Sequence, residues 1–518
     1  MSVRFFLRAR FRKSITPRRI GALALVCFCL PLLGCGAINR ITGRRTPTPQ
    51  VALTSLPPST PAPANSPAAT SVAPTPNAIT SPTAPTAPVP VSGGMERLIG
   101  TDVPPLDAPK YCQEMSSYGA RFTWTAIPWD GIEPIKGIFV WKRADDVIMA
   151  LHKCGFDIGV HVLSRNAWAT LPVPNIPSKS IASMPPKNMD DYYNFVFQLA
   201  SHYKGIISRY SIENEAHASS NWPSSPESYF QMLAVAYRAI HAADPNAIVE
   251  DSALSSSALG VLYANDLLKA GKKQEAIDFL HRYFATFSPP AGHGEPITVN
   301  SEQDMNNLLN QPEVQRLLVW APMLFDNNKY YDVEQLHYFG PWSDLPTIMG
   351  WVHSQLKARG ADKPLELWEM GYAWTNVSTF DPQAQARDVP KYMAVAIGEG
   401  GLRALSWLFT DIAFQAEGHP GLIGPNGPRP AAESFKVVAN ELNGTINAER
   451  LSLGAGVWGY RYDKSNGSVY ALWSDQPAKV TLPVQATQVT VTDITGRTTQ
   501  ANPQSLDVSD SPIFVTLK

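Results

Sequence analysis

Two acidic stretches, far apart along the chain, hold the side chains with the clearest potential for chemistry. Tyr-Ser-Ile-Glu-Asn-Glu at 210–215 and Leu-Glu-Leu-Trp-Glu-Met-Gly-Tyr at 365–372 each run from apolar residues into an acidic residue and then a loop. This pattern predicts a β-strand that delivers a carboxylate at its C-terminal end, which is the catalytic face of a (β/α)8 barrel. Two carboxyl groups that meet there match what hydrolysis of a glycosidic bond requires, since one protonates the leaving oxygen and the other attacks carbon or activates water.

The predicted pair is Glu215 as acid/base and Glu369 as nucleophile. A general acid must be protonated near neutral pH, and an ionised neighbouring carboxylate would raise the pKa of Glu215 accordingly. Glu213 lies two residues earlier and on the same strand face, so strand alternation alone leaves it as a rival acid. Glu366 lies three residues before Glu369, and we expect it on the opposite face of its strand as a surface or helix-facing charge.

These carboxylates need a scaffold, and the segment 95–445 provides a candidate. Short apolar runs alternate there with longer helical segments, which is typical of βαβ units, and no Gly-rich phosphate loop follows the first strand. The sequence therefore predicts an α/β fold, a (β/α)8 TIM barrel, in which residues 261–330 form a helical insertion over one rim. The expected strands are 98–101, 119–124, 156–163, 205–214, 247–252, 333–338, 365–369 and 404–409.

A second pattern begins at 446 and continues to 518. Short alternating strands with turn signals replace the strand–helix repeat, and Asn466-Gly467 between two apolar runs is a strong hairpin signal. We expect a small C-terminal β-sandwich domain.

The first 35 residues have the character of a targeting segment. A basic start precedes the apolar run 20–33, which is shorter than the roughly 20 residues that span a membrane. The run ends in Leu-Leu-Gly-Cys, which resembles a bacterial lipoprotein cleavage box and predicts lipidation at Cys35; an uncleaved signal anchor is the alternative. Residues 36–94 are rich in Pro, Thr and Ser and predict a disordered stalk. The expected location is extracellular, lipid-anchored at a bacterial surface or secreted, with the membrane as a partner through the anchor.

Composition narrows the functional classes. The formal net charge is −1 and neither half carries a basic stripe, which argues against nucleic acid as a partner. The 13 Trp residues suit a sugar-binding surface, and they equally suit a large core. Cys112 and Cys154 lie in the predicted folded body, where a disulfide and buried free thiols are both open. Neither has metal-ligand spacing, so we expect no metal or cofactor.

The motifs also resemble a known group of enzymes. Asn214-Glu215 after one strand and Glu369-Met370-Gly371 after a later one resemble the signature of retaining glycoside hydrolases of clan A. The segment from Trp129 to Trp141, W-x3-E-P-x2-G-x3-W, resembles a loop of its families 39 and 5. Arg121 resembles the strand-two arginine of the clan, His337-Tyr338 the strand-six pair and Trp407 the strand-eight tryptophan.

This resemblance implies roles for individual residues. Asn214 would bind the 2-hydroxyl of the sugar, Arg121 would keep Glu369 ionised, and Tyr338 would donate a hydrogen bond to the nucleophile. His161 either lines the groove or is structural, and both readings are open. Trp124, Trp168, Trp374 and Trp407 are candidates for stacking on sugars, with Trp407 the best placed, although core packing is the default for a single Trp. The implied substrate-binding residues are Arg121, Asn214, His161, His337, Tyr338 and Trp407.

Three functions compete. The leading prediction is a surface-attached retaining glycosidase that acts on an external oligo- or polysaccharide, with a β-linked plant-type polysaccharide favoured. A non-catalytic carbohydrate-binding lipoprotein on the same barrel is the main alternative. An adhesive protein that uses its terminal β-domain is the third. The sequence leaves the oligomeric state open.

Overall fold

The computed structural model describes most of the chain after residue 94. The described residues are 95–102, 107–172, 183–285, 297–371, 380–406, 409–410 and 421–517. The predicted lipidation site Cys35, the predicted stalk 36–94, Trp374 and Trp407 lie outside the described residues. Among the helices that are described, none combines the length and the apolar character that a membrane crossing needs.

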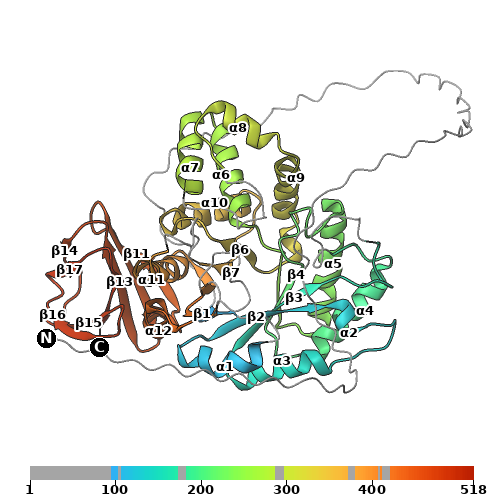
Figure 1. Ribbon diagram of the computed structural model, residues 1–518, viewed down its shortest axis with the longest axis horizontal. Coiled ribbons are helices and arrows are strands. Elements are labelled where there is room, and N and C mark those ends of the chain that lie inside the picture. The colour runs from blue at the N-terminus through green and yellow to red at the C-terminus, as the bar shows by residue number, and fades with distance from the viewer. Residues whose placement is uncertain are drawn as a thin grey trace, which may run out of the picture. The chain divides into compact units, whose positions relative to one another are not determined.

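The central element is a sheet of eight parallel strands in the order β5-β4-β3-β2-β1-β8-β7-β6 (Figure 1). Parallel bridges from Glu250 to Val333 and from Leu254 to Leu336 bring the two outer strands together, so the sheet is a nearly closed barrel. The predicted (β/α)8 fold is confirmed. The strands are β1 (Leu98–Thr101), β2 (Phe122–Pro128), β3 (Asp157–Leu163), β4 (Arg209–Ile212), β5 (Ile248–Glu250), β6 (Glu334–Tyr338), β7 (Leu365–Met370) and β8 (Gly401–Ser406).

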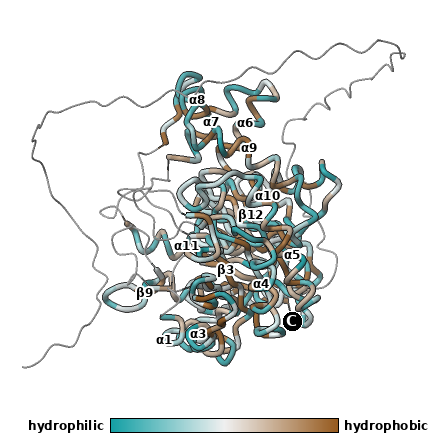
Figure 2. Tube along the Cα trace, turned by 90° about the vertical axis from the view of Figure 1, so that its right-hand side faces the viewer, coloured by the Kyte–Doolittle hydropathy of each residue, from teal (hydrophilic) through white to brown (hydrophobic). Residues whose placement is uncertain are grey.

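Amphipathic helices connect the strands and cover the barrel. They are α1 (Ala108–Ser117), α2 (Trp129–Ile132), α3 (Lys142–Lys153), α4 (Met189–His202), α5 (Pro226–Ala243), α6 (Ser256–Lys269), α7 (Lys273–Ala285), α8 (Glu302–Leu309), α9 (Pro312–Asp326), α10 (Leu345–Lys357), α11 (Pro382–Gly398) and α12 (Pro430–Leu442). Four of them, α6 to α9, lie between β5 and β6, where the sequence predicts a helical insertion. Figures 1 and 2 both show this group gathered together beyond the barrel strands, and Figure 2 shows both hydrophobic and hydrophilic residues in it.

Buried charges fill part of the barrel interior. Arg209 Nε on β4 lies 2.8 Å from Glu366 Oε1 on β7, and Arg209 Nη1 lies 3.0 Å from Asp157 Oδ2 on β3. Because β4 and β7 are not neighbours in the sheet, the first contact crosses the interior. The prediction that Glu366 is a surface or helix-facing charge is therefore wrong.

A register shift explains this position of Glu366. Along the β6–β7 ladder, Leu336 pairs with Leu367, but the next residue, His337, pairs with Glu369. The extra residue in β7 is Trp368, so strict alternation fails at this point, as it does at a β-bulge. Glu366 and Glu369 consequently both face the interior side of the barrel.

A disulfide settles the question that the sequence leaves open about the two body cysteines. Cys112 in α1 and Cys154 at the end of α3 are bonded, with a sequence separation of 42 residues. Closing a loop of this size restricts the unfolded chain. We expect the double variant Cys112→Ala/Cys154→Ala to lose about 2–4 kcal/mol of unfolding free energy. Urea unfolding with and without a reductant measures this, and a reductant effect that persists in the double variant would contradict it.

The C-terminal part forms two antiparallel sheets. A six-stranded sheet, β11-β12-β13-β18-β15-β16, and the pair β14-β17 share a small hydrophobic core that includes Tyr470, Leu472, Val480 and Leu506, as expected for a β-sandwich. The predicted hairpin joins β12 and β13, but its turn residues are Ser465 and Asn466, because Gly467 already pairs with Lys464 as the first residue of β13. The strands are β11 (Asn447–Arg450), β12 (Val457–Lys464), β13 (Gly467–Ser474), β14 (Ala478–Val480), β15 (Val489–Asp493), β16 (Thr498–Ala501), β17 (Leu506–Val508) and β18 (Ile513–Leu517).

Candidate active site

The two predicted carboxylates meet on one histidine. His337 Nδ1, at the end of β6, lies 2.8 Å from Glu215 Oε1 and 3.6 Å from Glu369 Oε2. These two carboxylate oxygens are therefore at most 6.4 Å apart, the sum of the two distances. The side chains of Glu215 and Glu369 are 24% and 14% exposed, so both remain open to solvent, whereas His337 is fully buried. Two strands on opposite sides of the barrel thus present their carboxyl groups to one point.

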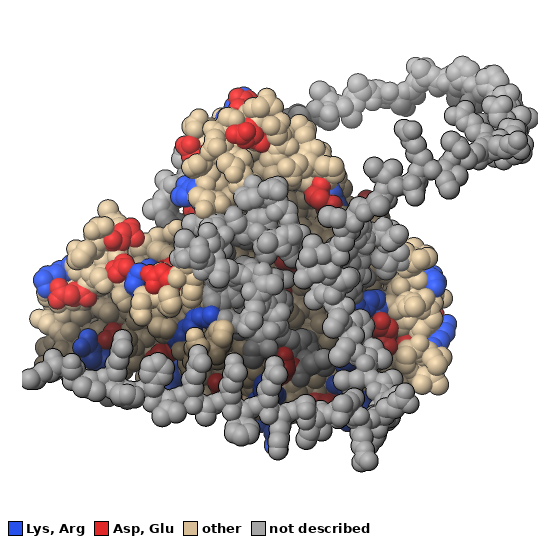
Figure 3. All heavy atoms as spheres, viewed as in Figure 1, with Lys and Arg blue, Asp and Glu red and all other residues tan. Residues whose placement is uncertain are grey.

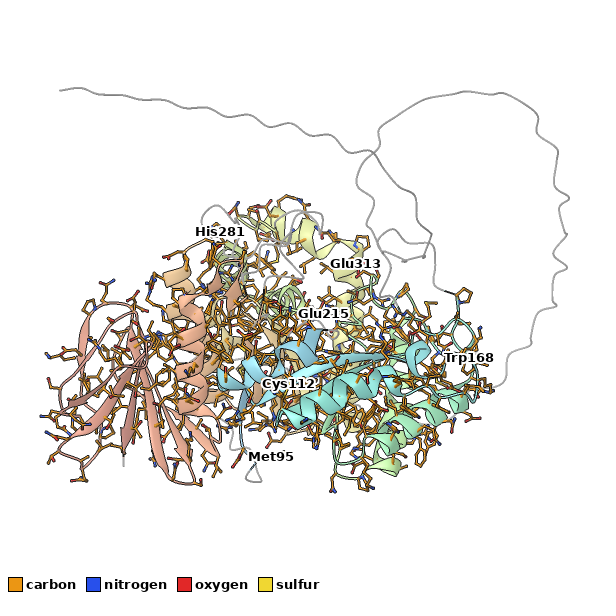
Figure 4. All side chains as sticks on the ribbon, turned by 60° about the horizontal axis from the view of Figure 1, so that its bottom comes forward. Met95, Cys112, Trp168, Glu215, His281 and Glu313 are labelled. Carbon is orange, nitrogen blue, oxygen red and sulfur yellow. A yellow bond between two sulfur atoms is a disulfide. The ribbon has the colours of Figure 1, made fainter. Side chains whose placement is uncertain are left out.

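A strained loop presents Glu215. The chain leaves β4 at Ile212 and places both Glu213 and Glu215 in the left-handed region, with φ of 68° and 44°. Left-handed backbone is costly for residues other than glycine, and such positions cluster at functional sites. The backbone N–H of Glu215 donates to the carbonyl of Ser252, which follows β5, and this fixes the turn. Glu215 is labelled in Figure 4.

The shared histidine sets the electrostatics of the pair. Burial raises the pKa of Glu369 to about 7, and the nearby charge of Glu215 acts in the same direction against the influence of His337. Burial would also raise the pKa of Glu215, but the hydrogen bond and charge of His337 outweigh it, so that pKa is lowered. Burial would lower the pKa of His337, but Glu369 and Glu215 raise it overall. These opposite shifts favour a proton on Glu369 over one on Glu215 in the unliganded protein.

This distribution of charge is the reverse of the prediction, which gives Glu215 the raised pKa. The physical reason is the position of His337, which lies closer to Glu215 than to Glu369 and stabilises the negative charge there.

Arg121, the predicted cation partner of Glu369, does not lie at the site. Arg121 precedes β2, is exposed, and donates to Ser116 Oγ and the carbonyl of Ala120. The prediction that Arg121 pairs with Glu369 is wrong, because β2 begins after Arg121 and runs on to Pro128.

Gln335 orients His337 and was not predicted as a site residue. Gln335 Oε1 lies 3.1 Å from His337 Nε2, and Gln335 Nε2 donates to Glu250 Oε2 at 3.0 Å. An amide oxygen needs a donor, so Nε2 of His337 carries a proton and its Nδ1 faces the two carboxylates. The i, i+2 spacing of Gln335 and His337 on one strand was the available signal, because alternation places both on the same face.

Tyr338 lies on the other face of β6. Its hydroxyl donates to the carbonyl of Pro341 at 2.7 Å, and its ring packs against Tyr283 of α7. The prediction that Tyr338 donates a hydrogen bond to Glu369 is wrong, because adjacent strand residues point to opposite sides and His337 takes the interior position.

His161 lies beneath the pair as a neutral, buried side chain. Burial lowers its pKa to about 3. Its Nδ1 lies 2.9 Å from the carbonyl oxygen of Glu213 and therefore carries the proton. Its ring meets Trp124 and Trp368 edge to face, with centroid distances of 4.8 and 5.0 Å. His161 is thus part of the floor of the site, where it supports the turn that leads to Glu215.

His161, His337 and Glu369 also offer one ligand atom each within 4.8 Å of one another. A metal ion there would need the lone pair of His337 Nδ1. A lone pair on Nδ1 would face Glu215 Oε1 at 2.8 Å, which is favourable only with a proton between the two atoms. The arrangement therefore fits a protonated histidine held between two carboxyl groups.

Three further predicted residues have partial outcomes. The structure brings Asn214 next to Glu215, and its Oδ1 is buried without a hydrogen-bond partner among the described residues. Trp124 donates from Nε1 to the carbonyl of Trp368 at 3.2 Å and stays partly exposed above His161. Trp168 donates to the carbonyl of Glu133 and packs edge to face on Trp129, so it supports a loop.

Glu213 is separated from the site by burial. It is 3% exposed and its Oε1 accepts a hydrogen bond from the backbone N–H of Ser164 at 2.7 Å. Burial raises its pKa to about 7. Its burial beside Ser164 favours Glu215 over Glu213 as the residue that meets Glu369.

The raised pKa values of Glu213, Glu369 and Asp251, each about 7 through burial, make stability depend on pH. The folded state holds protons that the unfolded state releases above about pH 4.5, so this stabilisation is lost as the pH rises through about 7. We expect the melting temperature to fall between pH 5 and pH 7.5. Each group contributes a slope of about 1.4 kcal/mol per pH unit. Glu213→Gln should flatten the profile in thermal unfolding, and an unchanged slope would contradict the assignment.

Several solved structures share this fold. A family 39 glycoside hydrolase from the gut symbiont Bacteroides cellulosilyticus WH2 matches with a TM-score of 0.52 and 18% identity, over 82% of this chain and 81% of that one. A family 39 β-xylosidase from Caulobacter crescentus matches with a TM-score of 0.53 and 14% identity, over 84% and 98%. This chain has the fold of family 39 glycoside hydrolases. The predicted resemblance to family 39 is thereby confirmed for the fold.

A glucosidase from Croceicoccus marinus is a further match, with a TM-score of 0.51 and 12% identity, over 83% of this chain and 96% of that one. No protein-family model matches the sequence, and neither does any curated protein. The family 39 fold therefore persists here at very low sequence identity.

Proposed function

We propose that the protein hydrolyses O-glycosidic bonds with retention of configuration, with Glu215 as acid/base and Glu369 as nucleophile. The observation that carries this proposal is the convergence of Glu215 and Glu369 on His337, with their nearest oxygens at most 6.4 Å apart. Carboxyl groups about 5–5.5 Å apart suit a covalent intermediate, whereas inversion needs about 6.5–9.5 Å to admit a water molecule. The family 39 fold supports the same reaction class by analogy.

The proposed roles of Glu215 as acid and Glu369 as nucleophile require that the two carboxyl groups together hold one proton. Near neutral pH the two carboxyl groups titrate as a unit and hold a single proton between them. The raised pKa of Glu369 and the lowered pKa of Glu215 favour that proton on Glu369 in the unliganded protein. A glycosidic oxygen next to Glu215 favours a proton at that position. Movement of His337 Nδ1 from Glu215 towards Glu369, 3.6 Å away, would then stabilise the ionised nucleophile.

The proposed substrate is an uncharged, β-linked oligo- or polysaccharide outside the cell. The net charge is −1. On the face of the molecule drawn in Figure 3, acidic and basic residues are interspersed over the described part, so this part of the surface has no patch of one charge that would select an ionic polymer. Two of the similar structures are described as a β-xylosidase and a glucosidase. The sequence up to Cys35 supports export and a lipid anchor in the membrane.

A panel of aryl β-xylosides, glucosides, galactosides and mannosides tests the proposal with the full chain. NMR of the first product should show a β-anomer that later mutarotates, which demonstrates retention. An α-anomer as the first product would contradict the mechanism. Sugar binding without turnover on every substrate would instead favour the non-catalytic carbohydrate-binding alternative.

A further inference from the structure

The loop that carries Glu215 is only partly held by its own hydrogen bonds, which include those from Ala218 to Glu215 and from Asn221 to Asn214. Residues 213–225 join β4 to α5 without a helix or strand, and two of them hold left-handed backbone. A loop of this kind exposes many carbonyl groups that need donors. Its position therefore depends on side chains that reach it from elsewhere in the fold.

One side chain from another element donates to four of these carbonyls. Arg316, on α9, donates from Nε to the carbonyl of His217 at 3.0 Å and from Nη1 to that of Ser224 at 2.8 Å. Its Nη2 donates to the carbonyl of Trp222 at 2.7 Å and lies 3.5 Å from that of Ala216, the residue after Glu215. A planar guanidinium with five N–H groups in fixed directions can hold several carbonyls at once, which a lysine cannot do.

The helix that carries Arg316 is itself fixed to the barrel. Trp320 of α9 is buried, and its ring lies 4.8 Å from that of Tyr229, whose hydroxyl donates to the carbonyl of Ile212 at the end of β4. Glu313, one turn before Arg316 and labelled in Figure 4, accepts hydrogen bonds from the backbone N–H and the hydroxyl of Ser219. Glu313 and Arg316, on one face of α9, thus form hydrogen bonds with the loop at several positions between Ala216 and Ser224.

We infer that Arg316 is a positioning residue that holds Glu215 in place for proton transfer to the leaving group. The inference rests on the proposed function and gives the α6–α9 segment a role in the reaction. Without the guanidinium, four carbonyls lose their donor, and the left-handed turn at Glu215 can relax. The contact between Glu215 and His337 then lengthens, and the acid no longer meets the glycosidic oxygen in a fixed geometry.

Leaving-group dependence tests this inference. A dinitrophenyl glycoside departs with little protonation, whereas a phenyl glycoside needs the acid. We expect Arg316→Ala to lower kcat/KM, which reports the acid-dependent first step, by about 100-fold for the phenyl glycoside and by less than about tenfold for the dinitrophenyl glycoside. Arg316→Lys should resemble Arg316→Ala, because an ammonium cannot span the carbonyls. Arg282→Ala is the matched control, since Arg282 is an exposed arginine on α7 that pairs with Asp344.

Equal losses on both glycosides, or losses that the control shares, would overturn the inference. Glu215→Gln serves as the reference: if it shows no leaving-group dependence, the proposed role of Glu215 fails independently of Arg316. Amide hydrogen exchange gives a readout without turnover. Arg316→Ala should accelerate exchange over 213–225 and leave the barrel strands unchanged. Unchanged exchange in this loop would overturn the inference even in a protein that hydrolyses nothing.

Discussion

Replacing Glu369 by alanine is expected to lower kcat on aryl glycosides by about 10⁴-fold, because no other carboxyl group in the described site can form the glycosyl intermediate. Glu369 faces the same histidine as Glu215, within 3.6 Å. Azide should restore turnover by occupying the vacated space, and its product should have inverted configuration. Measurement of kcat with and without azide, and NMR of the glycosyl azide, gives the result.

Glu215→Ala provides the complementary case. It should remain able to form the intermediate from a dinitrophenyl glycoside, and azide should yield a product of retained configuration. Glu213→Gln is the control, because Glu213 is buried beside Ser164 and does not reach His337. The opposite result, with retention in Glu369→Ala and inversion in Glu215→Ala, would show that Glu215 is the nucleophile and Glu369 the acid/base. The roles would then follow the pKa values of the unliganded protein and not the order of the strands.

The second large effect concerns stability. Arg209→Met is expected to cost about 3–5 kcal/mol of unfolding free energy, because it leaves Glu366 as a buried charge without its cation, whereas Asp157 keeps Arg403 as a partner. The Arg209 and Glu366 side chains are 3% and 0% exposed, and their nearest atoms are 2.8 Å apart. Urea unfolding at pH 7 measures the loss.

The double variant Arg209→Met/Glu366→Leu is the informative comparison. It removes both charges, so it should be more stable than Arg209→Met alone by a clear margin. If the double variant instead loses as much unfolding free energy as Arg209→Met and Glu366→Leu lose together, the two charges are not coupled across the barrel interior.

Much of the fold followed from local patterns. The eight strands and the hairpin at Asn466-Gly467 are visible in the sequence, because apolar periodicity and turn residues act over short distances. Strand order also brought Glu215 and Glu369 to one face. The errors came where one residue decides the outcome: β2 begins just after Arg121, and the extra residue Trp368 in β7 turns Glu366 inward.

Other features depend on contacts between distant segments. The roles of Tyr338 and Gln335 depend on which face of β6 points into the barrel, and the contacts of His337 with Glu215 and Glu369 decide that face. The hydrogen bonds from Arg316 to the loop after β4 could not be predicted, since nothing in the sequence near residue 316 indicates which carbonyl groups it contacts. The pKa values of the carboxylate pair likewise depend on differences of less than 1 Å around His337.

The position of Trp368 below the site depends on Gly159, which has no side chain. Trp368 packs against Gly159 of β3 so closely that a Cβ there would lie 2.3 Å from its ring. The indole also touches His161, which leads to the carbonyl of Glu213 and so to the turn before the acid. A single added carbon on β3 would therefore displace Trp368 and, through it, His161, so the position of the turn before Glu215 depends on a glycine two contacts away.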